Sequence, residues 1–168
     1  MKKTLIVLLL ICSCKSFCQK YVLQNEKNII SFITKKGKIL TLSKDKNNGY
    51  LVYRFGTKEK IQLEYPEKNK DSWKKFKYSY YHRGGGKMNS AMDLITVWFT
   101  IDDYEYGIFT YDRAGDEFSP ESFDVGIKIT NLKTKKETKL IAIDQSIKGS
   151  LYEITENELI KIDEDRID

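Results

Sequence analysis

Hydrophobic and polar side chains alternate along most of the chain after Ile29, with the two-residue period that is typical of β-strands. Turn residues interrupt this alternation at intervals of about eight to twelve positions, and no amphipathic stretch is long enough for a major helix. The pattern predicts nine strands and a shorter tenth one, over residues 29–34, 38–43, 50–55, 60–65, 75–80, 93–101, 104–111, 123–130, 137–143 and 151–154.

The segment 93–101 is the most apolar of these strands. Its two faces carry separate apolar sets, with Ile95, Val97, Phe99 and Ile101 on one face and Leu94 and Trp98 on the other. A strand with apolar residues on both faces is typically covered on both sides, so we expect it in the interior of a sheet. Two turns support the pairing of neighbouring strands. Gly37 can adopt the left-handed conformation, and Asp102-Asp103 can form a two-residue turn.

The length of 168 residues favours one domain. Eleven tyrosines, eight phenylalanines and two tryptophans supply enough bulky apolar surface for one core. The spacing of strands and turns predicts an all-β fold, namely a single-domain antiparallel β-sandwich or flattened barrel of about nine strands. We assign this domain to residues 29–168, which end in an acidic tail from Asp163 to Asp168.

Residues 1–18 have the pattern of a secretory signal peptide. Basic residues at Lys2 and Lys3 precede an apolar run over residues 5–11. This run is much shorter than the roughly 20 residues that a membrane-spanning helix requires, so we expect no membrane span after processing.

Two processing routes fit this segment. Ser16 and Cys18 are the small residues that signal peptidase prefers ahead of a cleavage site, which would leave Gln19 as the first residue. In the alternative route, Ile11-Cys12-Ser13-Cys14 resembles a bacterial lipobox, and Cys14 would carry a lipid anchor. After cleavage at Gln19, a short N-terminal segment over residues 19–28 precedes the β domain.

Export changes what the charge and the cysteine content imply. All three cysteines lie within residues 1–18, so the mature domain contains no disulfide although it enters a compartment that permits one. Removal of residues 1–18 takes away three lysines and no acidic residue, which lowers the net charge from +5 to +2. This small charge and the extracytoplasmic location argue against a nucleic-acid partner.

Four short segments follow one another in a distinctive order: Phe32-Ile33-Thr34-Lys35-Lys36-Gly37-Lys38, Tyr53-Arg54-Phe55-Gly56, Glu64-Tyr65-Pro66 and Tyr81-His82-Arg83-Gly84-Gly85-Gly86. In these segments the chain resembles a group of small secreted bacterial all-β proteins. The resemblance covers residues 29–143 and implies a fold but no function and no catalytic residue. Members of that group carry cysteine at the position of Ser43 and a glycine turn at Asp102-Asp103, so the resemblance implies no disulfide here.

The most unusual segment runs from Tyr78 to Lys87, because three consecutive glycines lose much chain entropy when they are ordered. Such a run is typical of a mobile hairpin connection or of a place where a partner approaches the backbone. In the second interpretation, Arg83 and Lys87 flank open backbone N–H groups and bind a carboxylate or phosphate of a protein or glycan. The candidate binding residues are Tyr80, His82, Arg83, Gly84, Gly85, Gly86 and Lys87.

Few catalytic arrangements remain open to this chain. His82 is the only histidine and the mature chain has no cysteine, which excludes sites built on two imidazoles or on a thiol. A carboxylate pair remains, as in glycosidases. Candidates near the central hairpin are Asp93, Asp102, Asp103 and Glu105. Because the chain has 24 acidic residues, a coincidental pair is expected, and we predict no catalytic residue.

Two further patterns have ordinary explanations. Acidic residues between Asp112 and Asp124 could wrap a calcium ion, but they lack the alternating aspartate spacing and Arg113 competes. We therefore predict an acidic surface loop, with no metal and no cofactor. Several tyrosines could form a stacking platform for sugars or for a partner protein, although half-buried sheet aromatics are more usual. These are Tyr50, Tyr53, Tyr78, Tyr80, Tyr104 and Tyr106.

These observations favour an exported, non-catalytic binding protein of the inhibitor or immunity type of the cell envelope, with a location that is periplasmic, extracellular or anchored at the outer membrane. In this hypothesis, the loop from Arg83 to Lys87 enters an acidic cleft of a partner protein, such as a lysozyme-like muramidase, or contacts a cell-wall glycan. The alternatives are a structural envelope lipoprotein acylated at Cys14 and a small carboxylate-dependent hydrolase.

Overall fold

The computed structural model describes residues 21–86, 90–115, 117 and 119–166. The expected signal peptide, with Cys14, lies outside the described residues, and so does Lys87 of the candidate binding loop. Within the described ranges, no helix is long and apolar enough to cross a lipid bilayer.

The chain folds into two β-sheets that pack face to face as a sandwich, which confirms the predicted all-β class. The first sheet has the strand order β10 (Lys148–Gly149), β1 (Glu26–Ile33), β2 (Ile39–Asp45), β3 (Leu51–Gly56) and β4 (Ile61–Tyr65). The second has the order β11 (Lys161–Ile162), β5 (Lys77–Arg83), β6 (Met92–Ile101), β7 (Tyr104–Arg113), β8 (Ser122–Asn131) and β9 (Glu137–Ile141). All pairs are antiparallel except β11 with β5.

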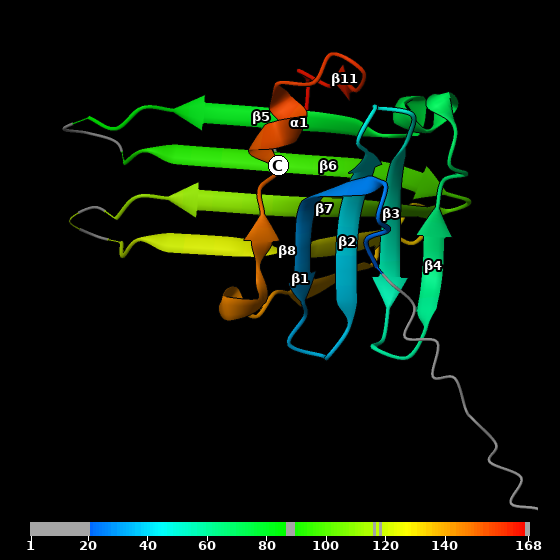
Figure 1. Ribbon diagram of the computed structural model, residues 1–168. Helices are drawn as coiled ribbons and strands as arrows, with labels where there is room; N and C mark the ends of the chain where they lie inside the picture. Colours follow the sequence, from blue (N-terminus) through cyan, green and yellow to red (C-terminus); the bar gives the residue numbers. More distant parts are fainter. Residues whose placement is uncertain (1–20, 87–89, 116, 118, 167–168) are drawn as a thin grey trace, which may run out of the picture.

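The strands of the two sheets cross, so the length of the second sheet lies across the width of the first (Figure 1). Each of β6, β7 and β8 has ten residues and is therefore about 33 Å long. Five strands side by side span only about 20 Å. The ends of β5–β8 that lead into the β5–β6 and β7–β8 loops consequently extend beyond β1 (Figure 1), and we call this part the overhang.

The core lies between the sheets and follows the predicted alternation. On β6, Ile95, Val97 and Phe99 are buried against the first sheet. Phe99 is the centre of an aromatic cluster in which its ring stacks on Tyr65 at 4.9 Å and on Tyr106 at 5.1 Å between ring centroids. Because large aromatic rings contribute much buried apolar area, this cluster joins β4 to β6 and β7.

The opposite face of β6 is covered by side chains and not by a further layer of strands. Leu94 packs with Phe109 and Tyr111 of β7. Trp98 lies beneath the guanidinium of Arg166, which is 4.1 Å from the ring centroid and forms a 3.0 Å ion pair with Glu105. The strand is therefore interior and apolar on both faces, as the sequence predicts.

The prediction of a tenth strand over 151–154 is wrong, because residues Tyr152–Thr155 form the short helix α1. Leu151 and Ile154 are both fully buried, and their spacing of three residues places both on one side of a helical turn. Two 3₁₀ helices, η1 (Lys70–Lys75) and η2 (Asp144–Ser146), lie in other connections. The turn predictions are confirmed, since Gly37 and Asp102 have φ values of 73° and 51°.

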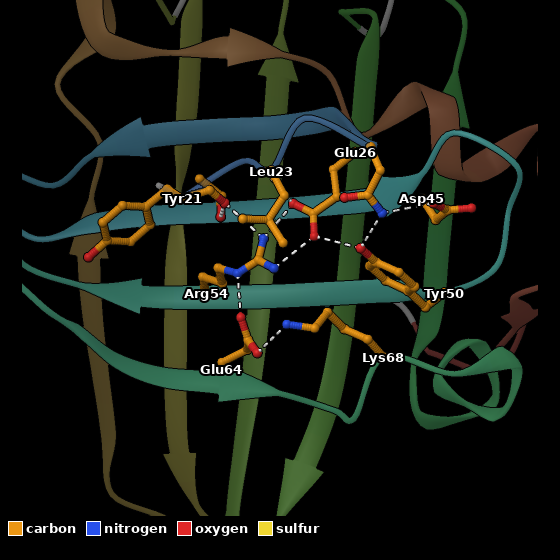
Figure 2. Close-up of polar contacts among 10 residues, drawn as sticks. Tyr21, Leu23, Glu26, Asp45, Tyr50, Arg54, Glu64 and Lys68 are labelled. Carbon is orange, nitrogen blue, oxygen red and sulfur yellow. Dashed lines mark hydrogen bonds and ion pairs between the residues drawn. The ribbon is translucent and has the colours of Figure 1, made fainter. Parts of the chain in front are cut away.

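A buried ion pair fastens the N-terminal segment to the outer face of the first sheet (Figure 2). Arg54 on β3 is only 1% exposed, and two of its guanidinium nitrogens donate to the carboxylate of Glu26 on β1 at 2.7 Å. A third nitrogen donates to Glu64 at 2.6 Å. The backbone of Tyr21 accepts a further hydrogen bond from Arg54, and the Leu23 amide donates to Glu26. The segment that begins at Tyr21 thus covers a charged pair that would otherwise face water.

The electrostatics of this pair keep both groups charged. Burial alone would raise the pKa of Glu26, but the hydrogen bonds from Arg54, Leu23 and Tyr50 outweigh it and lower that pKa below its ordinary value. Breaking such a pair is costly because the remaining charge stays buried without a partner.

We predict that Glu26→Gln destabilises the fold by about 3 kcal/mol, because Arg54 loses its buried counter-charge. Urea denaturation at neutral pH measures this loss. Because the pKa of Glu26 is lower in the folded protein than its ordinary value of 4.5, ionised Glu26 stabilises the fold at pH values above 4.5, and this stabilisation is lost as the pH falls through the folded-state pKa. The difference in free energy of unfolding between wild type and variant should therefore become smaller below pH 4.5. The exposed Glu67→Gln is the matched control and should change little; an equal effect of both substitutions would contradict the role of the pair.

Candidate functional site

Two rows of side chains on the inner face of β5–β8 mark the border between the core and the overhang. Cross-strand pairing places Tyr80, Ile95, Thr110 and Val125 in one row and His82, Asp93, Asp112 and Phe123 in the next. Exposure changes between the two rows on β6, β7 and β8. Ile95, Thr110 and Val125 are buried, whereas Asp93 is partly exposed and Asp112 and Phe123 are exposed.

A hollow of about 110 Å³ lies where the overhang meets the edge of the first sheet, and we call it the shoulder hollow. Its apolar walls come from both layers: Ile30 of β1 and Ile147 approach from one side, and Ile95, Val125 and Phe123 from the other. Gly149, Ser150 and Tyr152 complete the rim. The C-terminal part of the chain therefore builds one wall, because β10 pairs with β1 and α1 follows directly, beside β5 and β6 (Figure 1).

Asp93 is the polar centre of this region. Its Oδ2 accepts a 2.6 Å hydrogen bond from the Tyr152 hydroxyl, and its Oδ1 contacts Nδ1 of His82. The hydrogen bond from Tyr152, followed by that from His82, lowers the pKa of Asp93, which is therefore ionised at neutral pH. Partial burial and the Asp93 charge raise the pKa of Tyr152 above its ordinary value. The ring of Tyr80 packs edge-on against Tyr152 at 5.9 Å, which holds the hydroxyl in place.

Asp112 lies directly opposite Asp93 on the neighbouring strand. Directly opposed residues have Cβ atoms about 4.5–5.5 Å apart, and like charges at that spacing destabilise a sheet. Among the described side chains, Asp93 has two hydrogen-bonding partners and Asp112 has none. Two carboxylates therefore line the shoulder hollow, of which Asp93 is partly buried and hydrogen-bonded and Asp112 is exposed to solvent.

Thr110 also lines the shoulder hollow, but its hydroxyl lies beneath the surface. This residue is 7% exposed, and its buried hydroxyl forms no hydrogen bond with the described part of the chain. Because almost none of the hydroxyl oxygen is accessible, a group in the hollow does not reach it, and the hydroxyls of Tyr53 and Thr96 are buried and unpaired in the same way.

The residues expected to form a binding loop lie on two different faces. Tyr80 and His82 point toward the shoulder hollow side of β5, whereas Arg83 belongs to the opposite face, as strand alternation requires. Arg83 donates a 3.1 Å hydrogen bond from Nε to the backbone oxygen of Ser90, so it helps to close its own hairpin. The three glycines that follow, Gly84, Gly85 and Gly86, have no left-handed φ, and added Cβ atoms would meet open space at Gly84 and Gly86.

The other sequence candidates are scattered. Of the acidic residues considered for catalysis, only Asp93 lines the shoulder hollow, since Asp102 and Asp103 form the turn at the far end of β6 and Glu105 pairs with Arg166. No three histidine, cysteine, aspartate or glutamate side chains of the described residues lie close enough together to hold a metal ion. The tyrosines form no single platform, because Tyr53 is fully buried and Tyr104 is exposed at the far end.

Sequence reasoning missed Asp112, Thr110 and Tyr152 as site residues. A signal for Asp112 was present: a two-residue turn at Asp102-Asp103 pairs Ile101 with Tyr104, and counting back along both strands pairs Asp93 with Asp112. Thr110 carries no such signal, since an orphaned hydroxyl is visible only in three dimensions.

Comparison of the chain with protein-family models, with curated proteins and with solved structures finds no match. The resemblance to small secreted β-proteins therefore stays a prediction.

We predict that Tyr152→Phe raises the pKa of Asp93 toward its ordinary value, because the variant removes the hydrogen bond that contributes most to lowering it. A carbon-detected NMR titration of the Asp93 carboxyl measures the change. Tyr104→Phe, at the exposed far end of β7, is the matched control and should leave this pKa where it is. An unchanged Asp93 pKa in Tyr152→Phe would show that the hydroxyl does not hold the carboxylate in solution.

Proposed function

We propose that the protein is an exported, non-catalytic binding protein of the inhibitor or immunity type and that the shoulder hollow is its recognition site. The observation that carries this proposal is the hollow itself, in which apolar walls from both sheets meet the Asp93 carboxylate, held in place by Tyr152 and His82. A pocket with apolar walls and a few converging polar groups is the usual form of a binding site.

The surroundings of the shoulder hollow also suit a protein partner. Tyr80, His82, Phe123 and Tyr152 are all partly exposed around it. Aromatic residues of this kind are enriched in the central parts of protein interfaces. The β5–β6 loop that begins after Arg83 leaves the same end of the sheet (Figure 1), so it would flank a partner that is seated in the shoulder hollow.

The alternative, a carboxylate-dependent hydrolase, would use the same Asp93 and Asp112 pair. Retaining glycosidases place two such groups about 5 Å apart and require one of them to be protonated as a general acid. Asp93 does not suit the role of general acid, because the hydrogen bonds from Tyr152 and His82 lower its pKa and keep it ionised. Binding therefore has better support than catalysis.

Export itself gives a prediction about the N-terminus. Mass spectrometry of the protein isolated from its own cells should find Gln19 as the first residue. A lipid-modified Cys14 would instead favour the structural lipoprotein, and a chain that still begins at Met1 would contradict export.

We predict that a partner captured from envelope extract binds through the shoulder hollow. Asp112→Lys reverses a charge at its rim and should weaken the affinity at least tenfold in a calorimetric titration of the captured partner. Glu67→Lys makes the same charge change at an exposed position in the β4–η1 connection and should bind as wild type does.

Equal affinity of wild type and Asp112→Lys would contradict this placement of the site. In that case, weaker binding by the double variant Arg83→Ala, Lys87→Ala would place the binding site at the β5–β6 loop.

A further inference from the structure

A second hollow lies outside the sandwich, on the outer face of the first sheet. Its floor is formed by outward-facing residues of β1 and β2, and its sides are the N-terminal segment and the connection from β9 to β10. Ile33 and Ile143 are 40% and 39% exposed there, and they are neighbours because the Ile143 amide donates a hydrogen bond to the Ile33 backbone oxygen. Val22 and Ile39 line the same hollow. Aliphatic side chains from three segments are therefore gathered at one exposed place.

Lysines from three segments border this apolar surface. The β1–β2 turn joins the two strands of the floor, and it lies at the same end of the first sheet as the β3–β4 turn (Figure 1). The β3–β4 turn contacts one side of the hollow, since the Tyr21 hydroxyl donates a 2.7 Å hydrogen bond to the Thr57 backbone oxygen. The lysines are Lys35, Lys36 and Lys38 on the first turn, Lys58 and Lys60 on the second, and Lys148 on β10. We call the basic face these lysines together with Val22, Ile33, Ile39 and Ile143.

The positive charge of the basic face exceeds the negative charge on the same connections. The acidic residues there are Glu59, on the β3–β4 turn, and Asp144, which follows Ile143. Within the described part of the chain, several of the lysines form no ion pair, namely Lys35, Lys36, Lys60 and Lys148. A partner that complements exposed aliphatic side chains bordered by lysines must itself combine apolar groups with negative charge.

We propose that the basic face docks on the surface of a lipid bilayer that contains anionic lipids. Such a surface offers phosphate groups to the lysine ammonium groups and an apolar layer just beneath them to the aliphatic side chains and lysine stems. This surface is distinct from the shoulder hollow. Successive residues of the C-terminal segment alternate between the two, because Ile147 and Gly149 line the shoulder hollow and Lys148 lines the basic face.

The position of the N-terminal segment favours a membrane as the partner. The described chain begins at Tyr21, whose backbone oxygen accepts hydrogen bonds from Arg54 and Thr41, so this point of the chain is fixed beside the basic face. The chain from Cys14 to Tyr21 spans at most about 25 Å when it is fully extended. A lipid on Cys14 would therefore keep the bilayer within reach, and a lipid chain combined with a basic patch gives stable attachment. After cleavage ahead of Gln19, the basic face would bind alone and reversibly.

The test is co-sedimentation of the purified chain from Gln19 with lipid vesicles at neutral pH and low ionic strength. Vesicles with equal parts of phosphatidylglycerol and phosphatidylcholine should bind at least tenfold more strongly than vesicles of phosphatidylcholine alone, and added salt should weaken this binding. In bicelles of the same anionic mixture, a paramagnetic label on the headgroups should broaden the amide NMR signals of Ile33, Ile39 and Ile143. The signal of Leu132, in the β8–β9 connection, should stay sharp.

Matched charge variants separate the basic face from the overall charge of the protein. The double variant Lys35→Glu, Lys36→Glu should weaken binding to the anionic vesicles at least tenfold, because each lysine near a lipid surface adds to the attraction. The double variant Lys135→Glu, Lys136→Glu makes the same change of net charge in the β8–β9 turn. It should bind nearly as wild type does, since β9, about 17 Å long, separates that turn from the basic face.

A second pair of variants tests the aliphatic part. The double variant Ile33→Ser, Ile143→Ser should weaken vesicle binding about fivefold, because less apolar surface leaves water on docking. Leu132→Ser removes a side chain of similar exposure from the β8–β9 connection and should bind as wild type does. Melting temperatures of all variants show that each protein is folded.

Equal binding to the two kinds of vesicle would overturn the docking proposal. An equal loss in both charge-reversal variants would also overturn it, because the overall charge and not the basic face would then attract the lipid. If no vesicle binds but Lys35→Glu, Lys36→Glu abolishes binding of a captured protein, the basic face is a protein interface and the proposal is wrong. None of these results changes the test of the shoulder hollow, which uses Asp112→Lys.

Discussion

The unequal reach of the two crossed sheets is the constraint on which the rest of the structure depends. Strands of ten residues are longer than the first sheet is wide, so part of the inner face of β5–β8 has no strand above it. An uncovered apolar face would be costly in water. The outermost row carries three polar residues, His82, Asp93 and Asp112, beside the exposed Phe123, and the chain's own C-terminal segment packs against the overhang through Tyr152.

That C-terminal segment joins the two layers and shapes the site. It adds β10 to the edge of β1, forms α1 beside the overhang, and then places β11 next to β5. Leu151 and Ile154 are buried in the core, while Tyr152 on the same turn reaches Asp93. The same few residues therefore both stabilise the sandwich and hold the carboxylate in place. The Arg54 and Glu26 pair fixes the N-terminal segment on the outer face of the first sheet (Figure 2).

The local pattern of apolar and polar residues was sufficient to predict most of the strands. It did not show which residues from distant parts of the chain contact one another. Alternation identified the two faces of β6, and the turn at Asp102-Asp103 has the expected register. Alternation also suggested a strand over 151–154, because a short run that contains Leu151, Tyr152 and Ile154 fits a helical turn as well as a short strand. Arg54 looks like a solvent-facing residue in sequence, and only the covering segment at Tyr21 makes it a buried one. Of the candidate site, only the pairing of Asp93 with Asp112 could be predicted, because it follows from the register of the β6–β7 hairpin. Tyr152 joins the site only through packing of a distant segment.

The central claim is that the C-terminal segment docks on the overhang and encloses the shoulder hollow. Through-space NMR contacts test it most directly, measured between the rings of Tyr80 and Tyr152 and between the paired backbones of Ile30 and Gly149. The account predicts that both pairs of signals show cross-peaks in the free protein. Absence of both, with the contacts inside the β6–β7 hairpin intact, would mean that the segment is not docked and that the site does not exist in solution.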